Sequence, residues 1–179
     1  MKIYFASDHT GYELKGVLMA HVRDLPTPEW LQRQGGQRYE VEDCGAHTYD
    51  QTDDYPDFIE RASRKVSRAP AQSCAVVFGA SGQGEAMVAN RFPGVRAAVY
   101  YGPASRTQTD ASGDVIDLLR STRVHNDANV LSLGVRFIDE EEAKRAVSTW
   151  LSTPFSGDER HRRRIHKIDG IDNKNAPTP

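Results

Sequence analysis

The chain has 179 residues, of which 23 are Lys or Arg and 25 are Asp or Glu, so its formal net charge is −2. This balance argues against a protein that binds nucleic acid or a membrane surface. No apolar run reaches the roughly 18 residues of a membrane span, and the amino-terminal apolar segment is too short for a signal peptide. The only cysteines, Cys44 and Cys74, lack metal-site spacing. We therefore expect one cytoplasmic domain.

Short apolar segments alternate with amphipathic segments along the chain. Apolar runs predict strands at residues 3–6, 39–43, 75–78, 95–100 and 129–133. Helical spacing of apolar residues predicts helices at 11–25, 56–66, 85–90, 114–122, 139–151 and 158–169. This alternation indicates an α/β fold, in which a mainly parallel five-stranded sheet is covered by helices on both faces. The handedness of crossovers favours a doubly wound three-layer sandwich.

Two segments interrupt the alternation, and we interpret both as insertions into a smaller core. Residues 26–37 contain a helix-start pattern, Thr27-Pro28-Glu29-Trp30, followed by two glycines, and residues 102–113 are polar and turn-rich. We predict that residues 1–170 form a single domain and that residues 171–179 form a flexible tail. The 102–113 insertion follows a strand end. It could be a lid, although a passive surface loop is the commoner case.

The most informative segment follows the third predicted strand and reads Gly79-Ala80-Ser81-Gly82-Gln83-Gly84-Glu85. Glycines let backbone amides converge on one point, and a helix start adds free N–H groups, so the turn can cradle an oxyanion. Glu85 on its rim is a candidate base for proton abstraction beside a carbonyl. The spacing fits no dinucleotide fingerprint, P-loop or serine-hydrolase elbow. A plain strand-to-helix turn explains these residues about equally well.

Other polar residues lie where strands are expected to end or begin. Asp8 and His9 follow the first strand, and Arg136 follows the fifth. Because ligands of such sheets bind beyond the carboxyl ends of the strands, these side chains should lie near the glycine-rich turn. His125 and Asn126 precede the fifth strand. Taken singly, these residues are also explained as parts of polar turns.

The densest positive run contains Arg160 and Arg164, which lie four positions apart on one face of the last predicted helix, with His161 beside them. Two adjacent guanidinium groups suit a phosphate dianion. A solvated basic face is the alternative. Arg136 near the expected cleft favours the phosphate interpretation, which requires the last helix to reach that cleft in its own subunit or in a neighbour.

Together these motifs resemble the sugar-phosphate isomerase family that contains ribose-5-phosphate isomerase B and the galactose-6-phosphate isomerase subunits. The resemblance covers residues 1 to about 168 and rests on separated motifs in the same order: Ser7-Asp8-His9, Asp54-Tyr55-Pro56-Asp57, the turn at 79–85, His125-Asn126-Asp127, Gly134-Val135-Arg136 and Arg160 through Arg164. It implies a Rossmann-like sandwich, no metal or other cofactor, and a homodimer or tetramer with active sites between subunits. One branch of the family uses a cysteine at the position of Gly79. This chain resembles the branch with a glutamate at the position of Glu85, although Ala80 replaces a glycine common there.

The resemblance implies an aldose–ketose isomerase that interconverts ribose 5-phosphate and ribulose 5-phosphate through an enediolate. Glu85 would be the base, and Asp8 and His125 would assist ring opening. Ser81 and the amides of the turn from Gly82 through Gln83 to Gly84 would hold the enediolate oxygen. Sugar and phosphate would be bound by the remaining polar residues: His9, Asn126, Arg136, Arg160, His161 and Arg164. Tyr49 and Tyr55 lie in loops that could touch the sugar.

Two alternatives stay open. The substrate could be a six-carbon sugar phosphate, such as allose or galactose 6-phosphate, because the 102–113 insertion could alter the pocket length. The chain could also be a non-catalytic phosphosugar-binding module, which would keep the arginines but need no base. A helix start lowers the pKa of a carboxyl group, so Glu85 would be a weak base unless desolvation, expected from closure between two subunits, opposes that effect.

Overall fold

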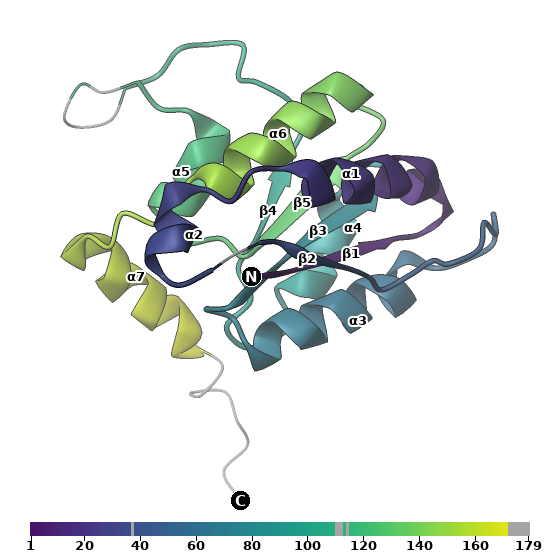
Figure 1. Ribbon diagram of the computed structural model, residues 1–179, viewed down its shortest axis with the longest axis horizontal. Coiled ribbons are helices and arrows are strands. Elements are labelled where there is room, and N and C mark those ends of the chain that lie inside the picture. The colour runs from purple at the N-terminus through teal and green to yellow at the C-terminus, as the bar shows by residue number, and fades with distance from the viewer. Residues whose placement is uncertain (37, 110–112, 114, 172–179) are drawn as a thin grey trace, which may run out of the picture.

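The computed structural model describes residues 1–36, 38–109, 113 and 115–171 (Figure 1). Five parallel strands form one sheet in the order β2-β1-β3-β5-β4. They are β1 (Lys2–Ser7), β2 (Glu40–Asp43), β3 (Ser73–Gly79), β4 (Ala97–Tyr100) and β5 (Val130–Gly134). This sheet confirms the predicted α/β fold and places β3 at its centre.

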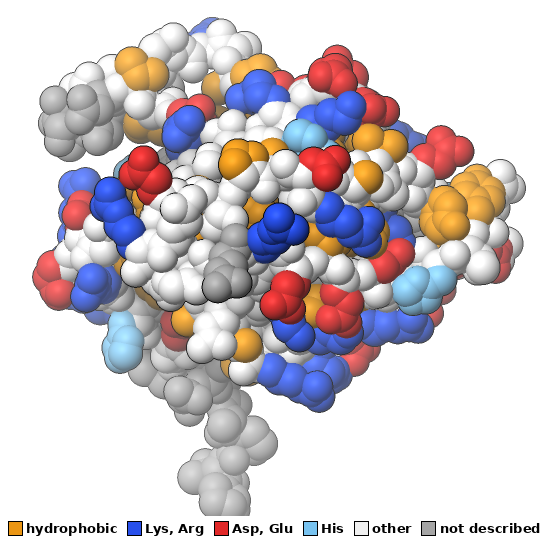
Figure 2. Space-filling view, viewed as in Figure 1, with side chains coloured by type: hydrophobic (Ala, Val, Ile, Leu, Met, Phe, Trp, Pro, Cys, Tyr) orange, Lys and Arg blue, Asp and Glu red, His pale blue; other side chains and the backbone are white. Residues whose placement is uncertain are grey.

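Helices cover both faces of the sheet, as the alternation of elements predicts (Figure 1). One face packs against α1 (Tyr12–Asp24), α2 (Glu29–Arg33), α5 (Leu118–Val124) and α6 (Glu140–Ser152). The other packs against α3 (Tyr55–Arg68) and α4 (Gln83–Ala89). A short 3₁₀ turn, η1 (His9–Gly11), precedes α1, and α7 (Glu159–Asp169) stands at the periphery. Figure 2 shows basic and acidic side chains intermingled over one face.

Alternating side chains of the strands supply the two cores. In β1, Ile3 and Phe5 face the α1–α6 layer, whereas Tyr4 and Ala6 face α3 and α4. All seven residues of β3 are buried, which is expected of a central parallel strand covered on both faces. The sheet is therefore a rigid base from which the loops at its carboxyl edge project.

Two element starts differ from the sequence prediction. β4 begins at Ala97 rather than at residue 95, because the N–H of Val95 closes a turn onto the carbonyl of Phe92 and Gly94 has a φ of 72°. The helix predicted at 114–122 begins at Leu118, where the carboxylate of Asp117 accepts the N–H of Arg120. Residue 114, where the helix was predicted to begin, lies outside the described residues.

The first predicted insertion contains α2, whose Leu31 joins the core. In the second, Thr109 pairs with Val115 in an isolated antiparallel bridge. Residues 172–179, most of the predicted tail, lie outside the part of the chain that the structure describes. None of the helices in the described ranges is long and apolar enough to cross a membrane.

Candidate active site

The glycine-rich turn joins β3 to α4 at the carboxyl edge of the sheet. Gly82 is the N-cap residue of α4 and has a φ of 72°, a conformation that side chains disfavour. Its carbonyl accepts the hydroxyl of Ser132 at 2.6 Å and the N–H of Ala86 at 3.1 Å. The N–H of Gln83 donates to the hydroxyl of Ser81 at 3.4 Å. Neighbouring strand and helix thus hold the turn in one conformation.

Glu85 lies in the first turn of α4, with only 4% of its surface exposed. Its carboxylate folds back over Gly79, where an added Cβ would lie 1.8 Å from Oε1. A side chain at position 79 would therefore occupy the place of the carboxylate. The glycine at the end of β3 makes room for the acidic group.

The pKa of Glu85 is raised above its ordinary value, chiefly because burial desolvates the carboxylate. The backbone N–H of Glu85 acts in the opposite direction, and the negative charge of Asp8 adds to the rise. From the sequence we expected two opposing effects on the pKa of Glu85, a decrease from the helix start and an increase from desolvation. In the structure the increase from desolvation is the larger. Burial within one chain is sufficient, and no second subunit is needed for it.

Tyr55 covers the other side of the turn. It is the first residue of α3, and its hydroxyl would lie 2.6 Å from a Cβ added to Gly84. At Gly134, the end of β5, an added Cβ would lie 2.8 Å from the ring of Tyr101 and 2.9 Å from the carbonyl of Ser81. Both glycines therefore allow aromatic side chains to approach the turn closely.

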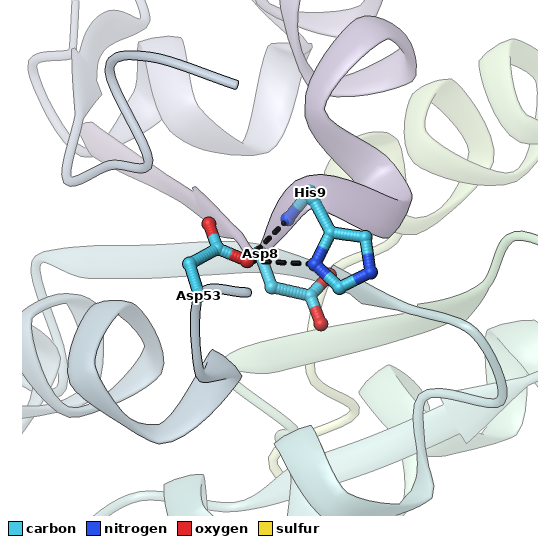
Figure 3. Close-up of side chains that lie close together, drawn as sticks. All are labelled: Asp8, His9 and Asp53. Carbon is cyan, nitrogen blue, oxygen red and sulfur yellow. Dashed lines mark hydrogen bonds and ion pairs between the residues drawn. The ribbon is translucent and has the colours of Figure 1, made fainter. Parts of the chain in front are cut away.

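Asp8 and His9 directly follow β1, where Asp8 caps the η1 turn that begins at His9. Asp8 is 7% exposed, and its Oδ1 accepts the N–H of Thr10 at 2.9 Å. His9 is held by Asp53, whose Oδ1 lies 3.0 Å from the backbone N and 2.7 Å from Nδ1 (Figure 3). Sequence reasoning missed Asp53. The only available signal was a pair of acidic residues immediately before Tyr55.

Asp8, His9 and Asp53 each offer a potential metal ligand, and these atoms lie within 4.8 Å of one another. However, His9 Nδ1 and Asp53 Oδ1 bond to each other, and Asp8 Oδ1 bonds to the backbone. The arrangement is therefore that of an Asp–His pair, rather than of three ligands directed at one ion.

Arg136 lies at the same edge, as predicted. Its backbone N–H donates to the carbonyl of Ala80 at 3.2 Å, which ties the segment after β5 to the glycine-rich turn. Its positive charge opposes protonation of His9. The structure thus brings together the predicted residues that follow strands β1, β3 and β5: Asp8, His9, Ser81, Gly82, Gln83, Gly84, Glu85 and Arg136.

The remaining predicted residues lie at the amino edge of the sheet, where the strands begin. His125 and Asn126 precede β5, and the carbonyl of Asn126 accepts Arg96 Nε at 3.0 Å just before β4. Gly134, at the far end of β5, pairs with Gly79. A five-residue strand spans about 16 Å, so His125 and Asn126 do not reach Glu85 within one chain.

The α7 helix also belongs to that edge. Asp169 pairs with Arg96 at 3.5 Å, and the N–H of Ser156, before α7, donates to the carbonyl of Val124 at 3.2 Å. Arg160 and Arg164 are exposed. The basic face predicted for phosphate is therefore presented to solvent.

His161 differs from its neighbours because it is buried. Its Nδ1 lies 2.8 Å from the hydroxyl of Ser156, and its ring centroid lies 4.7 Å from that of His125. Burial lowers the pKa of His161, and the positive charge of Arg160 adds to this. In this chain His161 anchors α7 against His125, and its predicted role in binding substrate stays a prediction.

Comparison with known proteins identifies the family. The model of a family described as Ribose/Galactose Isomerase matches residues 3–168. The ribose-5-phosphate isomerase B of Mycolicibacterium paratuberculosis is 36% identical over 165 residues, which is 92% of this chain and 87% of that protein.

Solved structures agree with this assignment. Ribose-5-phosphate isomerase B from Mycoplasma genitalium with bound ribulose-5-phosphate superposes with a TM-score of 0.75 at 31% identity, covering 97% of both chains. Type B ribose 5-phosphate isomerase from Trypanosoma cruzi gives a TM-score of 0.76 at 32% identity, covering 98% of both chains. The chain therefore belongs to the ribose/galactose isomerase family.

Proposed function

We propose that the protein interconverts ribose 5-phosphate and ribulose 5-phosphate through an enediolate, with Glu85 as the base. Ribose-5-phosphate isomerase B relatives, one of them solved with ribulose-5-phosphate, support the reaction. The proposed role of Glu85 rests on its burial at the rim of the glycine-rich turn, where its pKa is raised. A carboxylate whose pKa lies nearer to neutrality is a stronger base.

The reaction requires a proton to move between neighbouring carbons. When Glu85 removes the proton from carbon 2, negative charge develops on the carbonyl oxygen of carbon 1, and the hydroxyl of Ser81 and the backbone N–H groups from Gly82 to Gly84 stabilise it. The proton of the carbon-2 hydroxyl passes to that oxygen, and the protonated Glu85 returns its proton to carbon 1, which leaves the carbonyl group on carbon 2. Each well-placed donor of this kind lowers the barrier by about 3–4 kcal/mol. Because neighbouring elements already hold the turn, little reorganisation is needed.

The two edges of the sheet supply different parts of the site. Asp8 assists ring opening, and His9 and Arg136 bind the phosphate, beside Glu85. His125, Asn126, Arg160 and Arg164 lie too far away to join them within one chain. We therefore assign these residues to a second copy of the chain, so that a homodimer or tetramer forms shared sites. The buried free thiols of Cys44 and Cys74 suit a cytoplasmic location.

Hydrogen exchange at carbon 2 tests the proposal directly. Wild-type protein is expected to exchange the carbon-2 hydrogen of ribose 5-phosphate in deuterated water. Glu85→Gln should lower this rate by about 10²–10⁴-fold, because the base is lost. Glu141→Gln, which alters an exposed glutamate on α6, is the matched control and should leave the rate unchanged.

The same assay separates the other functions. Exchange that survives in Glu85→Gln would contradict the role of the base. Ligand binding without exchange in the wild type would support a phosphosugar-binding module instead. Faster turnover of allose or galactose 6-phosphate than of ribose 5-phosphate would replace the pentose assignment with a hexose one.

A further inference from the structure

Asp53 holds His9 at two points, although 44 positions separate them in the chain. One carboxylate oxygen, Oδ1, accepts both the backbone N–H and the ring Nδ1 of His9 (Figure 3). A carboxylate only accepts hydrogen bonds, so Nδ1 must carry the proton in this contact. The other ring nitrogen, Nε2, lies on the side of the ring away from Asp53 (Figure 3).

The loop between β2 and α3 fixes Asp53 in place. Asp50 begins a turn in which its carboxylate accepts the backbone N–H and hydroxyl of Thr52, and its carbonyl accepts the N–H of Asp53. The side chain of Asp53 is only 10% exposed, and its Oδ2 is buried without a hydrogen-bond partner in the described part of the chain. Among the described residues, the hydrogen bonds of the Asp53 side chain therefore both go to His9.

We propose that Asp53 is a positioning residue for His9, which holds the imidazole as a cation with Nε2–H free to bind the phosphate of the substrate. This inference rests on the proposed function, in which His9 binds phosphate. Asp53 does not reach the phosphate itself in this proposal. It acts by fixing the orientation and the charge of a ring that does.

The charges around His9 favour this state. Asp53 raises the pKa of His9 through its hydrogen bond and its charge, and the charge of Asp8 adds to the rise. Asp50 also interacts with His9 through its charge. Slight burial and the positive charge of Arg136 act in the opposite direction, but the pKa of His9 remains above its ordinary 6.5. The ring therefore stays protonated to a higher pH than a solvated histidine.

Titration of His9 by NMR tests the link between the two residues without any substrate. The chain has six histidines, and loss of one signal in His9→Gln assigns the resonance. The wild-type His9 should titrate above 6.5, with the proton retained on Nδ1 in the neutral form. Asp53→Asn keeps an oxygen acceptor but removes the charge, and should lower this pKa.

Asp50→Asn is the matched control, because it removes the same charge from the same loop without breaking a hydrogen bond to the ring. It should shift the His9 titration less than Asp53→Asn does. A wild-type titration at or below 6.5, or equal shifts in the two variants, would overturn the proposal. The wild-type measurement decides even if Asp53→Asn folds poorly.

Steady-state kinetics test the connection to substrate. At pH 7.5, Asp53→Asn should raise KM for ribose 5-phosphate about tenfold and leave kcat nearly unchanged, because a charged hydrogen bond to phosphate contributes equally to ground and transition states. The rise in KM with pH should begin at lower pH than in the wild type. An unchanged KM profile would contradict the positioning role. Carbon-2 exchange that survives in Glu85→Gln would instead contradict the role of Glu85 as the base, while the NMR result would still stand.

Discussion

The two edges of the sheet carry chemistry of different kinds. At the carboxyl edge, Glu85 and Asp8 are buried, and strand ends and turns hold them in place. At the amino edge, Arg160 and Arg164 project from α7, a peripheral helix in which only His161 is buried. A group that must react needs desolvation and fixed geometry, whereas cations that recruit a phosphate need to be accessible. In the proposed site, the buried base therefore lies at the carboxyl edge, and the α7 arginines at the amino edge are presented to solvent.

Burial has opposite consequences at the two edges. It raises the pKa of the Glu85 carboxyl, which makes the group a stronger base. It lowers the pKa of His161, which favours the neutral ring that packs against His125. Desolvation disfavours the charged form in both cases. The same physical effect therefore raises the pKa of the proposed base at one edge and favours a neutral, packed ring at the other.

The largest expected effect is the recovery of activity when two variants, each damaged at a different edge of the sheet, form mixed dimers. Glu85→Gln damages the carboxyl edge, and the double change Arg160→Ala/Arg164→Ala damages the amino edge. If the site is shared, a mixed dimer has one site with wild-type residues from both chains and one with both defects. Co-expressed, doubly tagged dimers should therefore regain isomerase activity at low substrate concentration.

A site contained within one chain gives the opposite result. Every site of the mixed dimer would then carry one defect, and activity would stay at the level of the two parent variants. Mixed dimers that show no recovery would thus contradict the shared site. Size-exclusion chromatography checks that both variants still assemble.

The next largest effect is expected at Gly79. Gly79→Ala would place a Cβ 1.8 Å from Oε1 of Glu85, so the carboxylate must move. A misplacement of about 1 Å can cost roughly 10²-fold in rate, and we expect a loss of this size in kcat. Gly16→Ala is the control, because an added Cβ there meets nothing within 4 Å. Equal kcat values for the two variants would show that Glu85 is not held where the reaction needs it.

The same geometry ties the residue at position 79 to the acidic group. A cysteine at this position would direct its side chain into the space that the Glu85 carboxylate fills. In this chain, glycine at position 79 leaves that space to the glutamate.

The sequence predicted the fold well because its strongest signals are local. The buried run of β3 and the apolar stripe of α6 are independent of distant residues. Starts of elements were less predictable. The helix predicted from residue 114 begins at Leu118, where Asp117 caps its first turn and Leu119 packs in the core.

The site was predictable where topology alone decides it. The rule that ligands bind at the carboxyl ends of parallel strands brought Asp8, Glu85 and Arg136 to one edge correctly. It gave no information on His125, which precedes a strand and therefore lies at the other edge. Asp53 could not be found because its role depends on a loop conformation that brings it to His9 across 44 positions.

A smaller effect is expected in the pH dependence of kcat. Because the folded pKa of Glu85 lies above the ordinary 4.5, the base is protonated, and kcat should fall, at a pH where a solvated glutamate would still be ionised. Below that pKa, kcat should fall about tenfold per pH unit. Measuring kcat at saturating substrate avoids the separate titration of the free substrate phosphate. An inflection at or below 4.5 would contradict the role of desolvation.

The smallest effect concerns stability, and it has the opposite sign to the effect on rate. A carboxyl group whose folded pKa is raised stabilises the fold below its unfolded pKa, and this contribution is lost as the pH rises through the folded pKa. At neutral pH the ionised Glu85 therefore destabilises the protein, and Glu85→Gln should raise Tm. A gain of about 1 kcal/mol would correspond to roughly 2–4 °C.

Thermal unfolding should show that gain at pH 7.5 and its disappearance near pH 4, while the exposed Glu141→Gln should not show this pattern. A Tm that falls at pH 7.5 would mean that the charge is well solvated in the folded state. The raised pKa, and with it the contrast between a buried reactive edge and an exposed binding edge, would then be wrong.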